Sequence, residues 1–243
     1  MIKAIMQIDL NNALALRYHE VALKSFERVS DIFEIEVVQC VLPTTLLPEL
    51  KDIPNALTKR SPQELASLHS NYRMAKRISE GERFWVLEHD AYLRPQHEDV
   101  FRMIMSKWLT KDSTFQLGMA NEFWTTVPAI ANMYCEQVRL GWDIGPMSLL
   151  HRVTDAYCRT KKHNHRDTYW PMNRFKNPEW RNKTGVDINV SIAYNRPSIV
   201  IDSPITQILD EKYGGTVRDR KRSNKIYVKE AHPDVEWIKL DNE

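Results

Sequence analysis

The chain has 243 residues and a net charge of only +2, with 42% hydrophobic and 9% aromatic residues, so a packed core is possible and no strongly charged partner is implied. The three cysteines lie far apart without a CxxC pair, which argues against a structural zinc site and against a disulfide framework. No apolar run approaches the length of a membrane span, and neither GxGxxG nor a P-loop motif occurs. We therefore expect a soluble cytoplasmic protein (in the host cytoplasm if the source is a virus) with no membrane partner.

The first part of the chain is predicted to form a β-α-β unit. Lys3–Ile8 is typical of a strand, Leu14–Val29 carries apolar residues at helical spacing, and Ile35–Leu42 is rich in Ile and Val and ends before Pro43. A polar turn separates the first strand from the helix. Such a unit implies two parallel strands joined by a right-handed crossover.

A helix and a strand that ends in two acidic residues come next. Ser61–Glu80 begins with serine, proline and, three residues on, glutamate, which is typical of a capped helix. After Gly81, the apolar run Phe84–Leu87 predicts a buried strand that ends at Glu88, and open α/β sheets bind ligands where strands end. Because residues two apart in an extended chain point the same way, Glu88 and Asp90 would face one Mg²⁺ or Mn²⁺ ion. The alternative is a solvated acidic turn.

The remaining chain continues to alternate helices and strands. We expect helices over Pro95–Leu109 and Pro128–Val138, short strands over Phe115–Met119, Gly185–Ala193 and Ser198–Ile201, and a turn at Ser203–Gln207. The predicted fold class is therefore α/β, with a mixed, mainly parallel central sheet flanked by helices. We expect a single domain over residues 1–243.

Residues 159–183 differ from the rest of the chain because basic and aromatic residues are interleaved there without a clear period. Such a mixture can follow a phosphate backbone while its aromatic faces stack on bases. The alternative is a solvated loop that packs on the domain. The residues predicted to contact an acceptor are Lys161, Lys162, Arg166, Trp170, Arg174 and Trp180.

The order of these features resembles the type A glycosyltransferases, and most closely the group of bacterial lipooligosaccharide and collagen hydroxylysine galactosyltransferases. The matching segments are Ile8–Asn11 with Arg17, Glu64–Ser70, Leu87–Asp90, Val186–Asp187 and Ser203–Gln207. Two departures stand out: His89 replaces an acidic residue of the family pattern, and His69–Ser70 reverses its serine–histidine order.

The resemblance implies a type A glycosyltransferase (GT-A-like) fold that uses a nucleotide sugar, most readily a UDP-sugar, and a divalent cation, Mn²⁺ or Mg²⁺. Residues 1–93 would form the half that binds the nucleotide sugar, and residues 94–243 the half that binds the acceptor. The implied donor-binding residues are Ile8, Asp9, Asn11, Arg17, Glu64, His69 and Glu88, and the metal ligands are Glu88 and Asp90. For Glu64 and His69 the alternative is that they cap or brace the helix beside the site. If the reaction inverts the anomeric centre, Asp143 and Asp187 are the candidate catalytic bases.

The acceptor is not fixed by the resemblance. The basic–aromatic segment favours hydroxymethylated bases of phage DNA, which an enzyme reaches by taking the base out of the stack. A lipopolysaccharide or another glycan is the competing acceptor. A different class of function also stays open, namely a non-catalytic nucleic-acid-binding module on a decayed glycosyltransferase core, because His89 weakens the acidic motif.

Overall fold

The computed structural model describes residues 1–50, 61–107, 115–117, 123–141, 149–150, 152–154, 156, 174–176, 189–193, 196–201, 205–210 and 236–238. Strand β1 (Ile2–Ile8), helix α1 (Ala13–Phe26) and strand β2 (Phe33–Gln39) form the predicted β-α-β unit, and β1 and β2 pair in parallel. A short 3₁₀ turn, η1 (Glu27–Val29), ends the helix. The unit predicted from sequence is confirmed.

The later elements run in the order that the sequence suggests, with additions. They are η2 (Pro48–Leu50), α2 (Pro62–Ser79), β3 (Trp85–Glu88), β4 (Ala91–Leu93), η4 (Pro95–His97), α3 (Glu98–Lys107), β5 (Phe115–Leu117), β6 (Phe123–Thr125), α4 (Pro128–Arg139), β7 (Arg174–Lys176), β8 (Asn189–Ala193), β9 (Arg196–Ile201), β10 (Ile205–Asp210) and β11 (Glu236–Ile238). Within the described part of the chain, no helix is long and apolar enough to cross a bilayer.

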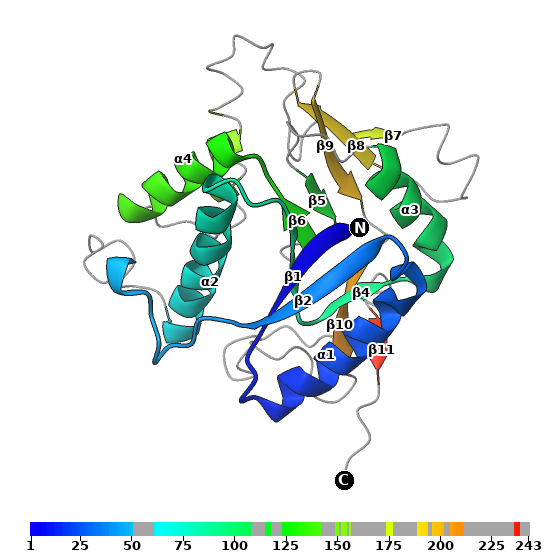
Figure 1. The fold of residues 1–243 in the computed structure, drawn as a ribbon, viewed down its shortest axis with the longest axis horizontal. Coiled ribbons are helices and arrows are strands. Elements are labelled where there is room, and N and C mark those ends of the chain that lie inside the picture. Colours follow the sequence, from blue (N-terminus) through cyan, green and yellow to red (C-terminus); the bar gives the residue numbers. More distant parts are fainter. Residues whose placement is uncertain are drawn as a thin grey trace.

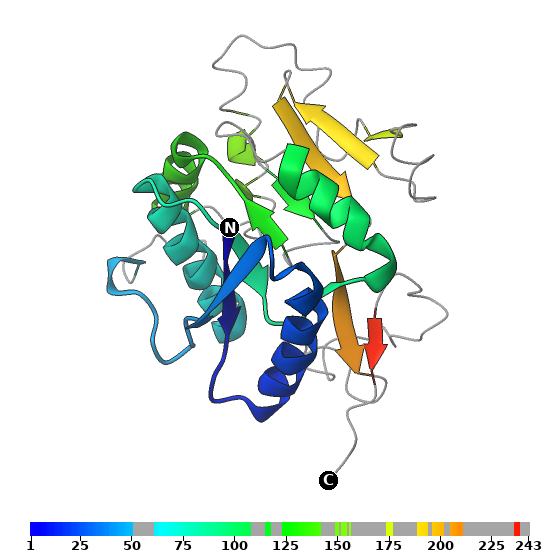
Figure 2. The same ribbon diagram turned by 45° about the vertical axis from the view of Figure 1, so that its right-hand side comes forward.

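The described strands form two sheets. The larger has the order β2-β1-β3-β6-β5-β9-β8-β7, and the smaller has the order β11-β10-β4 (Figures 1 and 2). Strands β2, β1 and β3 are parallel, whereas β6 runs antiparallel to both β3 and β5. A mixed sheet flanked by helices confirms the α/β class.

One element contradicts its prediction. The sequence predicts a turn at Ser203–Gln207 because of Pro204, but β10 begins at Ile205 and pairs antiparallel with β4. The side chains of Ile205 and Ile208 are fully buried. The strand is stabilised by a partner more than 100 residues earlier in the sequence, which a local turn signal does not reveal.

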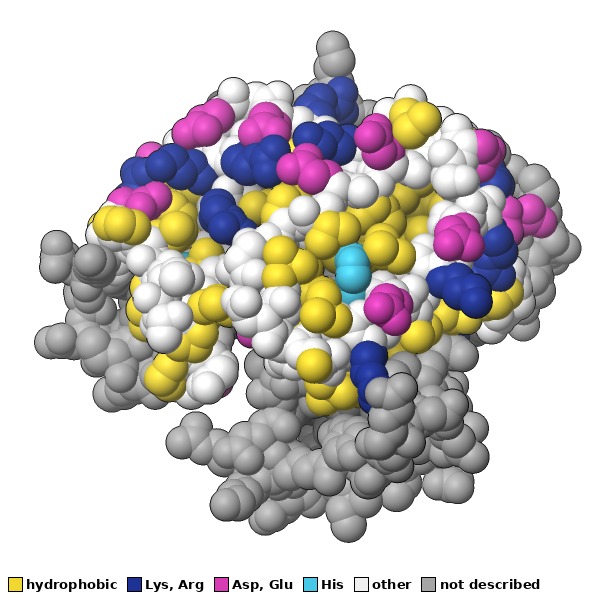
Figure 3. All heavy atoms as spheres, turned by 60° about the horizontal axis from the view of Figure 1, so that its bottom comes forward, with side chains coloured by type: hydrophobic (Ala, Val, Ile, Leu, Met, Phe, Trp, Pro, Cys, Tyr) yellow, Lys and Arg dark blue, Asp and Glu magenta, His cyan; other side chains and the backbone are white. Residues whose placement is uncertain are grey.

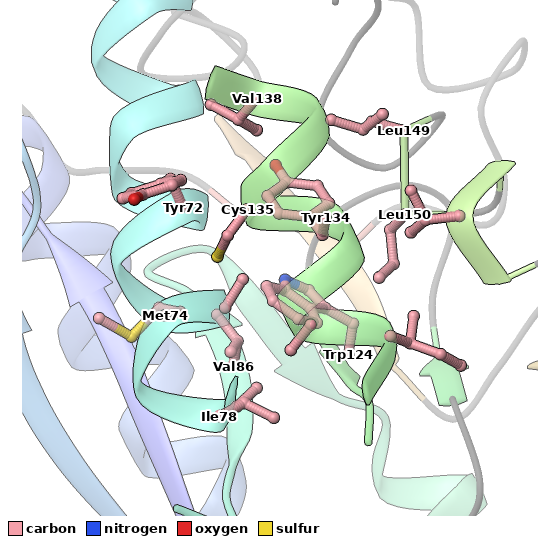
Figure 4. Close-up of a cluster of buried hydrophobic side chains, with 14 of the residues drawn as sticks. Tyr72, Met74, Ile78, Val86, Trp124, Tyr134, Cys135, Val138, Leu149 and Leu150 are labelled. Carbon is pink, nitrogen blue, oxygen red and sulfur yellow. The ribbon is translucent and has the colours of Figure 1, made fainter. Parts of the chain in front are cut away.

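Two hydrophobic cores lie on opposite faces of the parallel strands. On one face, Met6, Trp85 and Leu87 pack with residues of α1 and α3. On the other face, Ile5 and Val86 pack with residues of α2 and α4. Figure 1 shows the two pairs of helices on either side of the sheet, and Figure 4 shows the second core between α2 and α4. Successive strand residues therefore alternate between the cores, as the pleat requires.

Helix α2 begins with the capping box that its sequence predicts. The hydroxyl of Ser61 accepts a hydrogen bond from the backbone N–H of Glu64 (3.3 Å), and the Glu64 carboxylate accepts one from the backbone N–H of Ser61 (2.8 Å). We expect Ser61→Ala to lower the free energy of unfolding by about 1 kcal/mol, because a backbone N–H loses its acceptor. Urea denaturation of this variant and of Ser67→Ala, a control in the middle of the helix, measures the loss. Equal losses of unfolding free energy in the two variants would contradict the prediction.

Candidate functional site

The carboxyl ends of β1, β2 and β3 meet at one edge of the sheet because the three strands are parallel. On the face toward α2, the side chains change from apolar to polar at this edge. Ile5 and Val86 belong to the core, but two residues further along their strands stand Gln7 and Glu88, which are paired in register. Gln7 is 7% exposed. This edge, which we call the carboxyl edge, is where an α/β sheet binds ligands.

The turn after β1 is held by one of its own side chains and by one from the end of β2. The carboxylate of Asp9 accepts a hydrogen bond from the backbone N–H of Asn11 (3.0 Å), and the backbone N–H of Leu10 donates to the Gln39 side chain at the end of β2 (2.9 Å). Asn12 then caps α1. The predicted donor-binding residues Asp9 and Asn11 therefore lie in an ordered turn at the carboxyl edge.

The other two donor-binding candidates of this region lie on either side of that turn. Ile8 is fully buried, and its backbone carbonyl accepts a hydrogen bond from the N–H of Cys40 (2.7 Å). Ile8 therefore offers no exposed side-chain surface in this structure. Arg17 is half-buried on α1, one turn after the helix begins.

The acidic motif has a different backbone from the one expected. Strand β3 ends at Glu88, His89 and Asp90 form a turn, and β4 starts at Ala91. The assumption of an extended chain through Asp90 is wrong, so strand alternation does not place the two carboxylates on one face. A hydrogen bond from the backbone N–H of Ile208 in β10 to the Asp90 carbonyl (2.9 Å) anchors the turn instead.

The two carboxylates differ in exposure. Asp90 is 4% exposed, and Glu88 is half-buried at the end of its strand. Within the described part of the chain, no group of three or more His, Cys, Asp and Glu residues is arranged to hold a metal ion. Two carboxylates with few protein ligands suit Mg²⁺ or Mn²⁺ when substrate phosphates and water complete the shell. In ligand type alone the two carboxylates are compatible with such a cation, and metal binding at this turn stays a prediction.

His89, between the two acids, turns toward α1. Its ring lies edge-on to Tyr18, with 6.5 Å between the ring centroids. The nearby His19 contacts the Met6 sulfur through Nδ1 at 3.1 Å. Burial, together with the charge of His89, lowers the pKa of His19. On the face drawn in Figure 3, a histidine lies among hydrophobic side chains with an acidic residue beside it.

Glu64 and His69 both serve helix α2 in this structure. Glu64 completes the capping box, as described above. The Nδ1 atom of His69, which is 1% exposed, accepts a hydrogen bond from the backbone N–H of Leu47 (2.9 Å). Its neighbour Ser70 accepts one from the backbone N–H of Val41 (2.8 Å). The pair ties the loop after β2 to α2, and sugar contact by Glu64 or His69 stays a prediction.

The buried imidazole of His69 predicts an acid-dependent loss of stability. Burial lowers its pKa below the ordinary value of 6.5, so at lower pH the unfolded chain binds more protons than the folded one. The free energy of unfolding therefore falls as the pH drops through 6.5 toward the lowered pKa. We expect His69→Asn, which keeps an acceptor for Leu47, to lose less stability between about pH 8 and about pH 5.5 than the wild type. Urea denaturation at both pH values measures this, and identical losses would refute it.

Several predicted residues lie outside the described part of the chain. These are the candidate bases Asp143 and Asp187 and the acceptor residues Lys161, Lys162, Arg166, Trp170 and Trp180. Arg174 opens the backbone of β7. On the described surface of Figure 3, basic and acidic side chains are interspersed and no patch of one sign stands out. The prediction of a nucleic-acid acceptor rests on residues 159–183, of which the structure describes only 174–176.

Sequence reasoning missed two residues of the carboxyl edge. Gln7 is a polar residue that follows three apolar residues of β1, which could have marked it. Arg73 is one of several charged residues on α2, and its Nη2 donates a hydrogen bond to the backbone carbonyl of Gln39. Only the packing of α2 against the end of β2 distinguishes it from the other charged residues of this helix.

Comparison with known proteins gives no family model, no curated protein and no solved structure that matches this chain. Function is therefore argued from the carboxyl edge itself.

Proposed function

We propose that the protein is a metal-dependent glycosyltransferase that moves a sugar from a nucleotide-sugar donor to a hydroxyl acceptor. One observation carries this proposal: the parallel strands β1 and β3 bring Asp9 and Glu88 to a shared edge, and the Asp90 turn follows β3 directly. Carboxylates at such an edge suit a ligand that brings a cation and phosphates. The order of motifs that resembles the type A glycosyltransferases supports the same function.

Each part of the edge has a role in the proposal. Glu88 and Asp90 would hold the cation, which neutralises charge on the diphosphate leaving group when bound. The turn of Asp9 and Asn11 offers carboxylate, amide and backbone groups to the nucleoside, and it is already ordered by hydrogen bonds to the side chains of Asp9 and Gln39. Preorganisation of this kind lowers the entropic cost of binding. Asp143 and Asp187 remain the candidate bases.

The acceptor forms the finer part of the proposal. We favour hydroxymethylated DNA bases because of the basic and aromatic residues in 159–183, with a glycan as the alternative. Binding to DNA through phosphate contacts would weaken steeply as salt rises. Binding that is insensitive to salt would favour the glycan.

A donor-hydrolysis assay tests the proposal. The protein is incubated with Mn²⁺ and, separately, with UDP-, GDP-, CDP- and dTDP-sugars, and released nucleoside diphosphate is measured. Slow hydrolysis of one donor class, abolished by EDTA and restored by Mn²⁺, is the expected result. A protein that hydrolyses no donor and binds DNA equally with and without metal would instead be a nucleic-acid-binding module.

A further inference from the structure

Arg73 carries a charge that no described residue neutralises. Its side chain is half-buried on α2, Nη2 donates to the Gln39 carbonyl, and Nε is buried without a hydrogen-bond partner among the described residues. Arg77, one turn along the same helix, shows the usual arrangement. Its Nε and Nη2 donate to the two carboxylate oxygens of Glu82 at 2.7 and 2.6 Å.

An unneutralised guanidinium in a half-buried position is unfavourable. Burial is the main cause that lowers the pKa of Arg73, and repulsion from Arg77 acts in the same direction. A buried charge is normally paired, because desolvation is not repaid otherwise. A bound anion would supply the counter-charge that the described residues do not provide.

The position of Arg73 is that of a ligand-binding group. Arg73 contacts the backbone carbonyl of Gln39, the last residue of β2. The thiol of the next residue, Cys40, is influenced by two charges: Asp9 raises the pKa of the thiol, and Arg73 lowers it. Burial has the largest influence on this thiol and raises its pKa, which favours the uncharged form. The thiol therefore does not act as a counter-ion for Arg73. A second polar atom at the same edge, Oε1 of Gln7, is also buried without a partner in the described part of the chain.

We propose that Arg73 binds a phosphate group of a ligand at the carboxyl edge, between the end of β2 and α2. The guanidinium is planar, and its Nη groups offer N–H donors in a geometry that matches two oxygens of a phosphate. This phosphate subsite depends neither on a metal ion nor on sugar transfer.

A bracing role for Arg73 makes different predictions from a binding role. If Arg73 only holds the end of β2, Arg73→Met lowers the melting temperature and phosphate has no specific effect. If Arg73 binds phosphate, the apolar variant is as stable as the wild type in sodium chloride, because it removes an unneutralised charge. The stabilisation by phosphate is then lost, because a ligand stabilises only the state that binds it.

Thermal unfolding without metal tests the subsite. The melting temperature is measured for the wild type, Arg73→Met, Arg73→Lys and the matched control Arg77→Met. Each protein is heated in sodium phosphate, sodium acetate and sodium chloride of equal ionic strength. In a second series, each is heated with UMP or with uridine. Phosphate and UMP, but not acetate or uridine, are expected to raise the melting temperature of the wild type and of Arg77→Met. We expect phosphate to bind at least about tenfold more weakly to Arg73→Met and Arg73→Lys.

The outcomes separate cleanly. A phosphate response that survives in Arg73→Met overturns the subsite, as does a wild type that responds to neither phosphate nor UMP. If Arg73→Met fails to fold, the phosphate response of Arg73→Lys tests the subsite instead, because lysine keeps the positive charge and lacks the planar fork of donors. An equal response in phosphate and acetate means a general anion effect and also overturns the proposal. Asp90→Asn should keep the phosphate response, because the measurement is made without metal. The phosphate subsite can therefore be confirmed even if the proposed metal site is wrong.

Discussion

Asp90→Asn is expected to lower Mn²⁺-dependent donor hydrolysis by about a thousandfold or more, equivalent to about 4 kcal/mol of transition-state stabilisation. The substitution keeps the size of the side chain and removes the negative charge that would bind the cation. Because Asp90 is 4% exposed, an isosteric change is preferable to alanine. Initial rates at saturating Mn²⁺, with the melting temperature recorded in parallel, measure the effect.

The control for this experiment is Asp99→Asn, an exposed acid in the first turn of α3. It removes one negative charge from the same protein, and we expect wild-type rates. A rate for Asp90→Asn within threefold of the wild type, with an unchanged melting temperature, would show that the turn after β3 does not hold the cation. An equal loss in both variants would point to the net charge instead.

Phe101→Ala is expected to lower the free energy of unfolding by about 3–5 kcal/mol. Phe101 is fully buried, with its ring centroid 5.4 Å from that of Phe33 and 6.1 Å from that of Phe26. These three rings fasten α3 to the β-α-β unit. Truncation removes the contacts and leaves a cavity that the surrounding helices fill only in part.

Phe101→Leu separates the effect of lost buried volume from the effect of lost aromatic contacts. It keeps most of the buried volume and should cost only about 1–2 kcal/mol. Urea denaturation with a common slope for all variants gives the difference in the free energy of unfolding. If alanine costs no more than leucine, the three rings do not form a rigid joint between α3 and the unit.

The described elements from β1 to β3 follow their sequence closely because their signals are local. Helix α2 starts at a capping box, and Gly81, whose φ of 104° favours glycine, follows its end. Ala4–Met6 in β1 and Trp85–Leu87 in β3 are apolar without interruption because both faces of these strands are covered by helices. The local sequence of β10 predicts a turn instead of a strand, because its partner β4 is distant in sequence.

The sequence predicted which acidic residues lie at the candidate site, but it did not predict how the backbone places them. The sequence identified Asp9, Glu88 and Asp90 as residues that follow strands, and the parallel pairing brings the ends of β1 and β3 together. It could not show that the chain turns at His89, since β10 fixes that turn from far away. Nor could it distinguish Arg73 from Arg77, because the difference is whether Glu82 is within reach.

The most direct test is a crystal of the protein soaked with Mn²⁺ and UDP, with anomalous scattering used to locate the metal. We predict one strong manganese peak in contact with the Asp90 carboxylate and with the diphosphate, close to Glu88. A peak elsewhere, or a diphosphate bound away from the end of β3, would contradict the proposed site.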